Sequence, residues 1–309
     1  MRNREKDCAD FVKAMIETSP MPRNQIAALS GLTNTYIRDL ESGKYESVRR
    51  EKLIALAIAV NLDLSETDEL LMLFDRMPLS TEDIPTFLNI ASKRRGSAAL
   101  MPLRDLFPLE LALLSAERRP GQEIVVNIQP TYCLSSKSHR RYTERFMAAE
   151  HTLFGDLVEA ITAERKRLLD QNLASHRFDQ YICIDCLMHY IHTADDDQDR
   201  QWRIQHIQNV IQYLEKYANF HFFIIQTCPT ASFTLKLAPD SSQSSDNLFH
   251  VLWPRHNVWK KRTGRLTGFT TDNPVIIQNF KEEIESLKGY VMKECHDRPR
   301  LVAFLQSLI

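Results

Sequence analysis

The sequence predicts a multidomain chain, in which an all-α bundle at the N-terminus precedes a larger mixed α/β (α+β) domain. The length of 309 residues exceeds the usual size of one domain. Apolar residues recur at helical spacing through residues 6–75, whereas β-branched runs interrupt helical patterns only after residue 123. We therefore expect domains at 1–76 and 123–309, joined by a helical connector at 77–122.

The first domain is expected to be a compact bundle of about five short helices. Its apolar residues recur at intervals of three and four, with no alternation of period two. The residues that set this spacing are Phe11, Val12, Met15, Ile16, Ile26, Leu29, Ile37, Leu40, Leu53, Leu56, Ala57, Val60, Leu70, Leu71 and Phe74.

The connector is expected to hold one or two short helices and no separate core. Pro78, Pro85 and Pro102 interrupt it at short intervals. A helix over 106–116 is predicted, ended by the Arg-Arg-Pro-Gly sequence at 118–121.

Strands and helices follow one another in the C-terminal domain. Strands are predicted at 123–132, 181–191, 220–226, 232–238, 248–253 and 265–270. Helices are predicted near 140–174, 201–217, 274–294 and 298–308.

Composition excludes several classes of protein. A net charge of −1 excludes a uniformly basic nucleic-acid coat protein. The eight glycines form neither GxGxxG nor GxxxxGK[ST], and no HExxH, GxSxG or kinase motif occurs, so we expect neither an enzyme nor a bound cofactor. A charged N-terminus and the lack of an apolar run of about 18 residues predict no export and no membrane span. The expected location is the cytoplasm, with six free thiols.

Residues 23–43, RNQIAALSGLTNTYIRDLESG, have the spacing of a helix-turn-helix unit. Ala27 is small where two helices must pack closely, and Gly31 allows a tight turn four residues later. Thr33 can cap the next helix through its hydroxyl. In such units the second helix enters the major groove of DNA.

The segment resembles the Xre/Cro/C1-type helix-turn-helix family of transcriptional regulators. The matching residues are Ile26, Ala27, Gly31, Leu32, Thr33, Tyr36, Ile37, Leu40, Glu41 and Gly43. Many members carry an arginine late in the first helix, near this glutamate, but Ile16 stands there, so Glu41 needs another partner.

The resemblance implies binding of double-stranded DNA. Carried over by position, the base-reading residues are Thr33, Asn34, Thr35 and Arg38. The residues that flank this helix and could hold phosphates are Arg23, Asn24, Lys44, Tyr45, Arg49 and Arg50. Residues 1–62 contain ten Lys/Arg against eight Asp/Glu, so we expect only modest non-specific affinity. The alternative is a helical hairpin whose charges are only solvated.

Cys183, Cys186, His189 and His192 form a C-x2-C-x2-H-x2-H run of zinc-ligand types. A spacing of three drifts around a helix and alternates across a strand, so neither element turns all four toward one ion. Two of them could join ligands from elsewhere. We expect no metal site here but a buried strand with core cysteines, with a redox pair of the two cysteines as a further alternative. A basic stretch around Trp259, at 255–265, could bind an anion or form a solvated hairpin edge.

These observations predict a sequence-specific DNA-binding transcriptional regulator that acts as a homodimer. The C-terminal domain is expected to dimerise and to sense a small-molecule or protein effector. Two other functions remain open, namely an enzyme with a DNA-binding appendage and an antitoxin-like protein-interaction regulator.

Overall fold

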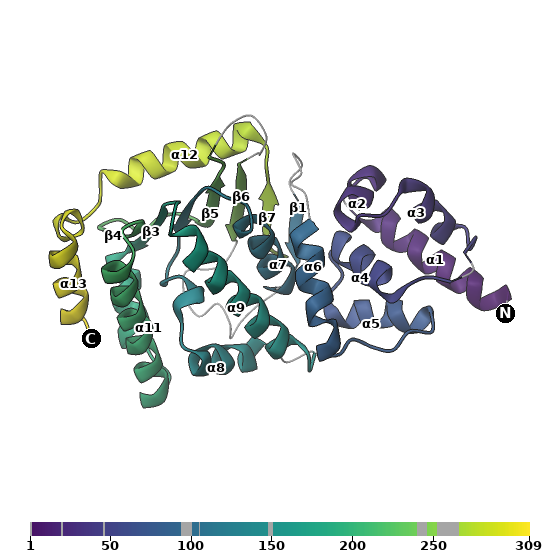
Figure 1. Cartoon of the computed structure of the whole chain (residues 1–309), viewed down its shortest axis with the longest axis horizontal. Helices are drawn as coiled ribbons and strands as arrows, with labels where there is room; N and C mark the ends of the chain where they lie inside the picture. The colour runs from purple at the N-terminus through teal and green to yellow at the C-terminus, as the bar shows by residue number, and fades with distance from the viewer. Residues whose placement is uncertain are drawn as a thin grey trace.

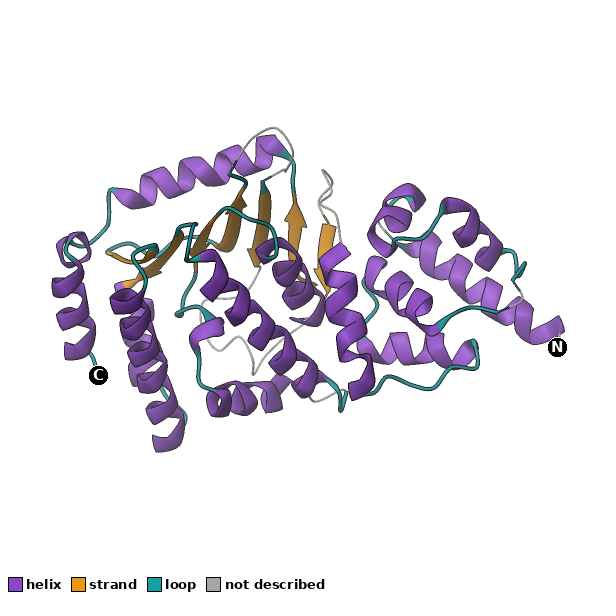
Figure 2. Cartoon of the chain, in the orientation of Figure 1, coloured by secondary structure: helices purple, strands orange, loops and turns teal. Residues whose placement is uncertain are grey.

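A computed structural model describes residues 2–19, 21–45, 47–93, 101–104, 106–147, 151–239, 246–251 and 266–309. In this part of the chain the fold is α+β, as predicted. Helices α1–α5 lie together at one end, with α6 between them and a mixed sheet (Figure 1). The strands form one layer with helices on both sides (Figure 2).

The N-terminal segment forms five α-helices, in agreement with the apolar spacing. They are α1 (Arg2–Thr18), α2 (Arg23–Ser30), α3 (Asn34–Glu41), α4 (Arg50–Ala59) and α5 (Leu64–Leu73). Polar side chains set two of the starts: Thr33 caps α3, and Asp63 and Glu66 form a capping box at α5.

The segment predicted as a helical connector contributes to the sheet as well. It contains α6 (Ile84–Lys93), β1 (Met101–Arg104) and α7 (Leu106–Glu117). Strand β1 was not predicted, because four residues interrupted by Pro102 give no alternating pattern. Its position explains the proline: β1 is an edge strand paired only with β7, and a proline is tolerated there.

The sheet has seven strands in the order β1-β7-β6-β5-β2-β3-β4. The remaining strands are β2 (Gln122–Val126), β3 (Phe178–Cys183), β4 (Phe220–Ile225), β5 (Ser232–Leu237), β6 (Asn247–Val251) and β7 (Leu266–Thr271). Strands β2, β3 and β4 are parallel, and every other pairing is antiparallel. The carboxyl ends of β2, β3 and β4 therefore meet at the same edge of the sheet.

The helices of this part are α8 (Lys137–Met147), α9 (Phe154–Asn172), α10 (Ile184–His192), α11 (Asp197–Lys216), α12 (Pro274–Lys288) and α13 (Arg298–Ser307). In Figure 1, α12 lies above the sheet and α7 and α9 lie below it. The prediction of one helix over 140–174 was wrong, since α8 and α9 are separate helices that contact each other. The predicted strand at 181–191 was also wrong beyond Cys183, where α10 begins.

Two apolar cores stabilise the molecule. The first runs from the N-terminal helices through α6 and α7 to α9. Between α6 and α7, the rings of Phe87 and Phe107 meet edge-to-face with their centroids 5.1 Å apart. The second lies between the sheet and helices α10–α13. The N-terminal helices therefore share a continuous core with α7 and α9.

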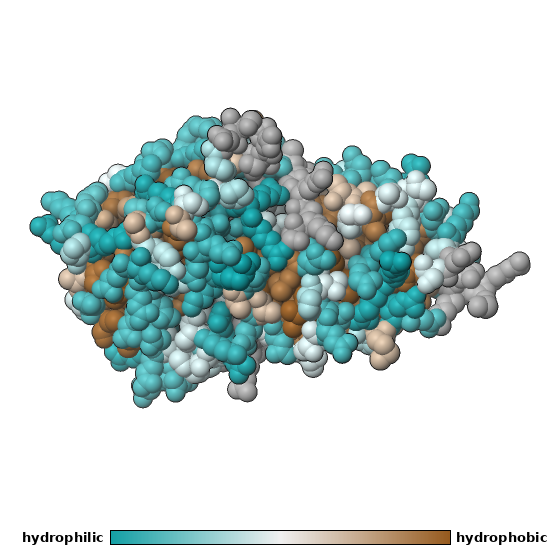
Figure 3. Space-filling view, in the orientation of Figure 1, coloured by the Kyte–Doolittle hydropathy of each residue, from teal (hydrophilic) through white to brown (hydrophobic). Residues whose placement is uncertain are grey.

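Hydrophilic residues cover most of the face seen in Figure 3, with smaller apolar areas between them. Within the described ranges, no helix combines the length and the apolar character needed to cross a bilayer.

Candidate nucleic-acid interface

Helices α2 and α3 are joined by a short turn at Gly31. This residue has φ of 68°, in the left-handed region that glycine adopts at little cost. The amide of Leu32 donates to the carbonyl of Ala27, which closes the end of α2. Helix α3 then starts at once, because the Thr33 hydroxyl accepts a hydrogen bond from the Tyr36 amide at 3.1 Å. The turn thus fixes where α3 begins.

The two faces of α3 differ sharply. Ile37 and Leu40 are buried, with 0 % and 1 % exposure, and α3 packs on α1 and α2. The residues on the opposite side are exposed, and they are the four that the sequence predicts as base-reading: Thr33, Asn34, Thr35 and Arg38. We call these four residues the α3 face. They stand together on one helix surface with no acidic residue in its first turn.

Arg23 links the start of α2 to the end of α3. Its Nη2 donates to Oε1 of Glu41 at 2.6 Å, and the Glu41 side chain is only 10 % exposed. This is the partner of Glu41 that the sequence left open. The Arg23 guanidinium, which was predicted as a phosphate contact, thus also holds the two helices together, with its side chain 38 % exposed.

Arg50 also has internal partners. Its Nε and Nη2 donate to the two carboxylate oxygens of Asp83 at 2.9 and 2.6 Å, and it donates to the carbonyls of Met77 and Pro78. Burial raises the pKa of Asp83, but the hydrogen bonds from Arg50 and Ser80 outweigh this and hold it below its ordinary value. Arg50, which was predicted as a phosphate contact, is thus paired with Asp83 in the chain itself.

The other predicted phosphate residues differ in exposure. Asn24, Lys44 and Arg49 are exposed, with Asn24 Oδ1 accepting from the Gln25 amide at 3.0 Å. Tyr45 is half-buried, and its ring lies 5.3 Å from that of Phe74. Of these three exposed side chains, Asn24 lies in the first turn of α2, Lys44 follows α3, and Arg49 lies at the start of α4.

Lys52 adds a cation that the sequence argument missed. Its amino group lies 3.9 Å above the centre of the ring of Tyr36, a residue in the first turn of α3. Burial raises the pKa of Tyr36, while the nearby charge of Arg49 lowers it in part. In the sequence, only its nearness to Arg49 and Arg50 indicated that Lys52 could belong to the same basic group. Together, Asn24, Lys44, Arg49 and Lys52 form what we call the flanking set.

The structure divides the predicted zinc-ligand run. Cys183 ends β3 and Cys186 lies in the first turn of α10, and both are buried. His189 and His192 are exposed further along α10 and do not join them. Their place is taken by Cys228, which follows β4 and which no local motif identifies. Two members of the run, Cys183 and Cys186, thus lie beside a cysteine from elsewhere in the chain.

The basic stretch at 255–265 lies outside the described residues. Comparisons with protein-family models, with curated proteins and with solved structures found no match to this chain.

Proposed function

We propose that the protein is a sequence-specific DNA-binding transcriptional regulator that places α3 in the major groove. The observation that supports this most is the α3 face, an exposed set of base-reading side chains beside two buried residues and a glycine turn. The major groove, about 12 Å wide, admits one helix. The second helix of a helix-turn-helix unit is the one that enters it.

The chemistry of the α3 face suits base recognition. Asn34 can pair through two hydrogen bonds with adenine, and Arg38 can do the same with guanine. The methyl groups of Thr33 and Thr35 can contact a thymine methyl. Because Arg23 and Arg50 are held internally, sequence-independent affinity depends in this proposal on the flanking set.

Loss of Lys44 or Arg49 should weaken binding to every DNA sequence alike. Each substitution, Lys44→Ala or Arg49→Ala, should make the negative slope of log affinity against log salt less steep by about 1, since one phosphate contact is lost. Fluorescence anisotropy with random duplexes at several salt concentrations measures this slope. Lys13→Ala is the matched control, because Lys13 is exposed on α1 and, among the described residues, its ion pair is with Glu17 at 3.9 Å. A slope that is the same in all three variants would contradict the phosphate role.

The larger part of the chain has a regulatory role in this proposal. It joins two copies and responds to a small-molecule or protein effector, which shifts the equilibrium between DNA-competent and incompetent arrangements. A homodimer in the cytoplasm would read two half-sites about one helical turn apart.

Selection of bound sequences from random duplex DNA tests the proposal. The full-length chain should enrich one motif, with two-fold symmetry if it binds as a dimer. The double variant Asn34→Ala/Arg38→Ala should keep the circular dichroism spectrum of the wild type, because both side chains are exposed. It should enrich no motif, because the proposed contacts with adenine and guanine are lost. The same motif enriched by the double variant would place recognition elsewhere on the protein.

A further inference from the structure

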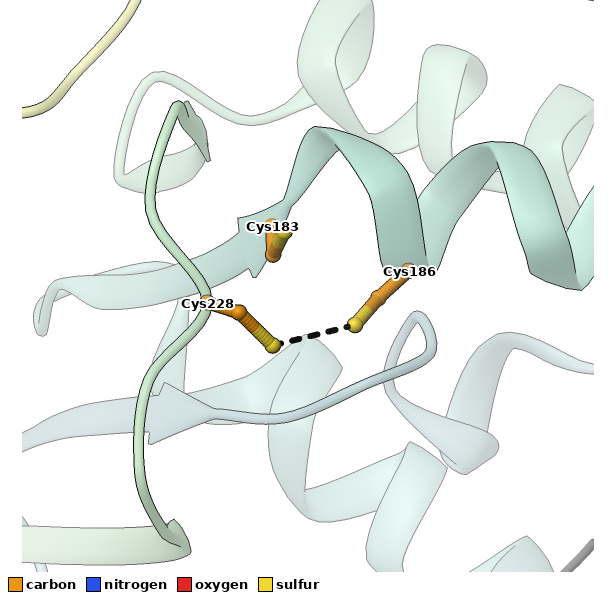
Figure 4. Close-up of side chains that lie close together, drawn as sticks. All are labelled: Cys183, Cys186 and Cys228. Atoms are coloured by element: carbon orange, nitrogen blue, oxygen red, sulfur yellow. Dashed lines mark hydrogen bonds between the residues drawn. The ribbon is translucent and has the colours of Figure 1, made fainter. Parts of the chain in front are cut away.

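Three cysteine sulfur atoms converge from separate segments of the chain. The Sγ atoms of Cys183, Cys186 and Cys228 all lie within 4.8 Å of one another, and those of Cys186 and Cys228 are 3.6 Å apart. Figure 4 shows Cys183 at the end of a strand, Cys186 on the following helix, and Cys228 on a separate loop that faces both. The arrangement depends on the tertiary fold, because Cys228 is 42 residues beyond Cys186.

The cluster lies where open sheets hold ligands. Cys183 is the last residue of β3, and it is paired in register with Ile225, the last residue of the parallel strand β4. Cys228 follows Ile225 by three residues. The site is thus at the carboxyl ends of two adjacent parallel strands, and ligands bind outside such ends in open α/β sheets.

The sulfur spacing fits a metal ion better than a disulfide. A zinc–sulfur distance of about 2.3 Å in tetrahedral geometry places sulfur atoms about 3.8 Å apart. The Cys186 and Cys228 sulfur atoms, 3.6 Å apart, are already close to this separation. The other two sulfur–sulfur distances are at most 4.8 Å, so each sulfur pair would have to close by no more than about 1 Å. A disulfide needs about 2.05 Å, so Cys186 and Cys228 would have to approach by a further 1.5 Å or so.

Electrostatics favours a divalent ion over a monovalent one. Three thiolates with a 2+ ion carry a net charge of −1, whereas with a 1+ ion they carry −2, and burial penalises the larger charge. Cys183 is the N-cap of α10 and Cys186 lies in its first turn, where the helix dipole stabilises negative charge.

We propose that Cys183, Cys186 and Cys228 together bind one divalent thiophilic d10 metal ion, of which Zn(II) is the probe, through three thiolates. A water molecule would complete the coordination on the side of the half-buried Cys228. Each thiol gives up its proton as its sulfur binds, so three protons leave when one ion enters. Without metal, burial raises the pKa of the Cys186 thiol to about 12, and the thiol keeps its proton at neutral pH.

The test is a titration of the reduced, metal-free, full-length protein with Zn(II) against a chelating dye. The expected result is one tight equivalent per chain. Cd(II) in place of Zn(II) should give the ultraviolet charge-transfer band of thiolate–cadmium bonds, with the intensity of three such bonds. This outcome does not depend on whether the chain binds DNA, so the two proposals fail separately.

Cys228→Ser is the informative variant, since Cys183 is fully buried whereas Cys228 is half-buried in a loop. It should weaken Zn(II) binding more than about 100-fold, because loss of a ligand exceeds the usual effect of an outer-shell residue. Cys295→Ser is the matched control, as Cys295 is also half-buried but contacts Ile224 instead, and it should bind as the wild type does.

Three results would overturn the proposal. One is a folded wild-type protein that binds neither Zn(II) nor Cd(II). Another is unchanged affinity in Cys228→Ser. A third is a Cys186–Cys228 disulfide that forms in mild oxidant while the reduced protein takes up no metal, which would assign a redox role to the pair.

Discussion

At the scale of single residues, His206 is a histidine that is buried with both ring nitrogens hydrogen-bonded. It is 1 % exposed, and both ring nitrogens are used: Nε2 donates to the carbonyl of Thr131 at 2.9 Å, while Nδ1 accepts from the Tyr190 hydroxyl at 2.8 Å. Only the neutral ring can do both. Burial, and then the proximity of His139, lower the pKa of His206 to about 3, despite the opposing hydrogen bond to Thr131. Burial likewise lowers the pKa of His139 to about 4.

These histidines should make the protein less stable in mild acid. Above pH 6.5 or so neither the folded nor the unfolded state protonates them, so their contribution to stability is complete. Below that pH the unfolded state binds protons that the folded state refuses, so the free energy of unfolding falls until the folded pKa values are reached. His206→Gln keeps both hydrogen bonds without the titration. It should remove about 2–3 kcal/mol of the loss between pH 6 and pH 4.

Urea denaturation of both proteins across this range measures the difference. The comparison also isolates His206 from Glu123, whose pKa burial raises to about 7 and whose effect has the opposite sign. Identical pH profiles for wild type and variant would contradict the assignment.

The sequence identified the residues of α3 but not all their partners. The helical period separates the buried Ile37 from the exposed Arg38, whereas the four residues of the α3 face were predicted from the resemblance to the helix-turn-helix family. The Arg23–Glu41 ion pair could not, because it depends on how α2 and α3 cross. Cys228 was missed for the same reason, since its position beside Cys186 is set by the pairing of β3 with β4.

At the scale of elements, two glycines have opposite roles. Gly31 has φ of 68°, and a Cβ there would meet no atom within 4 Å, so its substitution by alanine costs only backbone strain. Gly155 lies within α9, also with open space at its Cβ position. We predict that Gly31→Ala lowers the free energy of unfolding by about 1 kcal/mol, whereas Gly155→Ala leaves it unchanged or raises it by up to about 1 kcal/mol.

Urea denaturation of the two variants beside the wild type provides the comparison. Each variant serves as the other's control, because both add one methyl group to open space. Equal effects of the two substitutions would mean that the turn between α2 and α3 does not require a left-handed residue.

Element boundaries in the C-terminal part were harder to predict than element types. Cys183 ends β3 and α10 starts at Ile184, yet residues 181–191 are apolar except for Asp185 and His189, and periodicity does not distinguish a short buried strand from a buried helix. The split between α8 and α9 was hidden because the apolar pattern continues across it. Strand β1 exists through its pairing with β7, and long-range pairing leaves no local signal.

At the scale of the molecule, the shared core joins the proposed DNA-binding helices to the rest. Helix α4 packs on α6, which packs on α7 and α9, so no solvent layer separates the N-terminal bundle from its neighbours. A movement of the α3 face relative to the sheet would therefore have to involve α6. In the proposed function, α6 would carry the response of the C-terminal part to α3 by moving between two discrete positions.

The continuous core also predicts a single unfolding transition. All three tryptophans lie after residue 200, so their fluorescence reports on the C-terminal part, whereas circular dichroism reports on helices throughout. The two signals should change at the same urea concentration. An earlier change in circular dichroism would show that the N-terminal bundle unfolds independently.

Recognition of DNA through α3 is the central claim, and the affinity of Arg38→Ala for two DNAs tests it most directly. Binding is measured to a selected duplex and to a random one, with Lys13→Ala as the control for loss of an exposed charge. We predict that Arg38→Ala loses about 1–3 kcal/mol on the selected duplex and much less on the random one, because a base contact is lost. Equal losses on both duplexes, or no loss on either, would contradict the placement of α3 in the major groove.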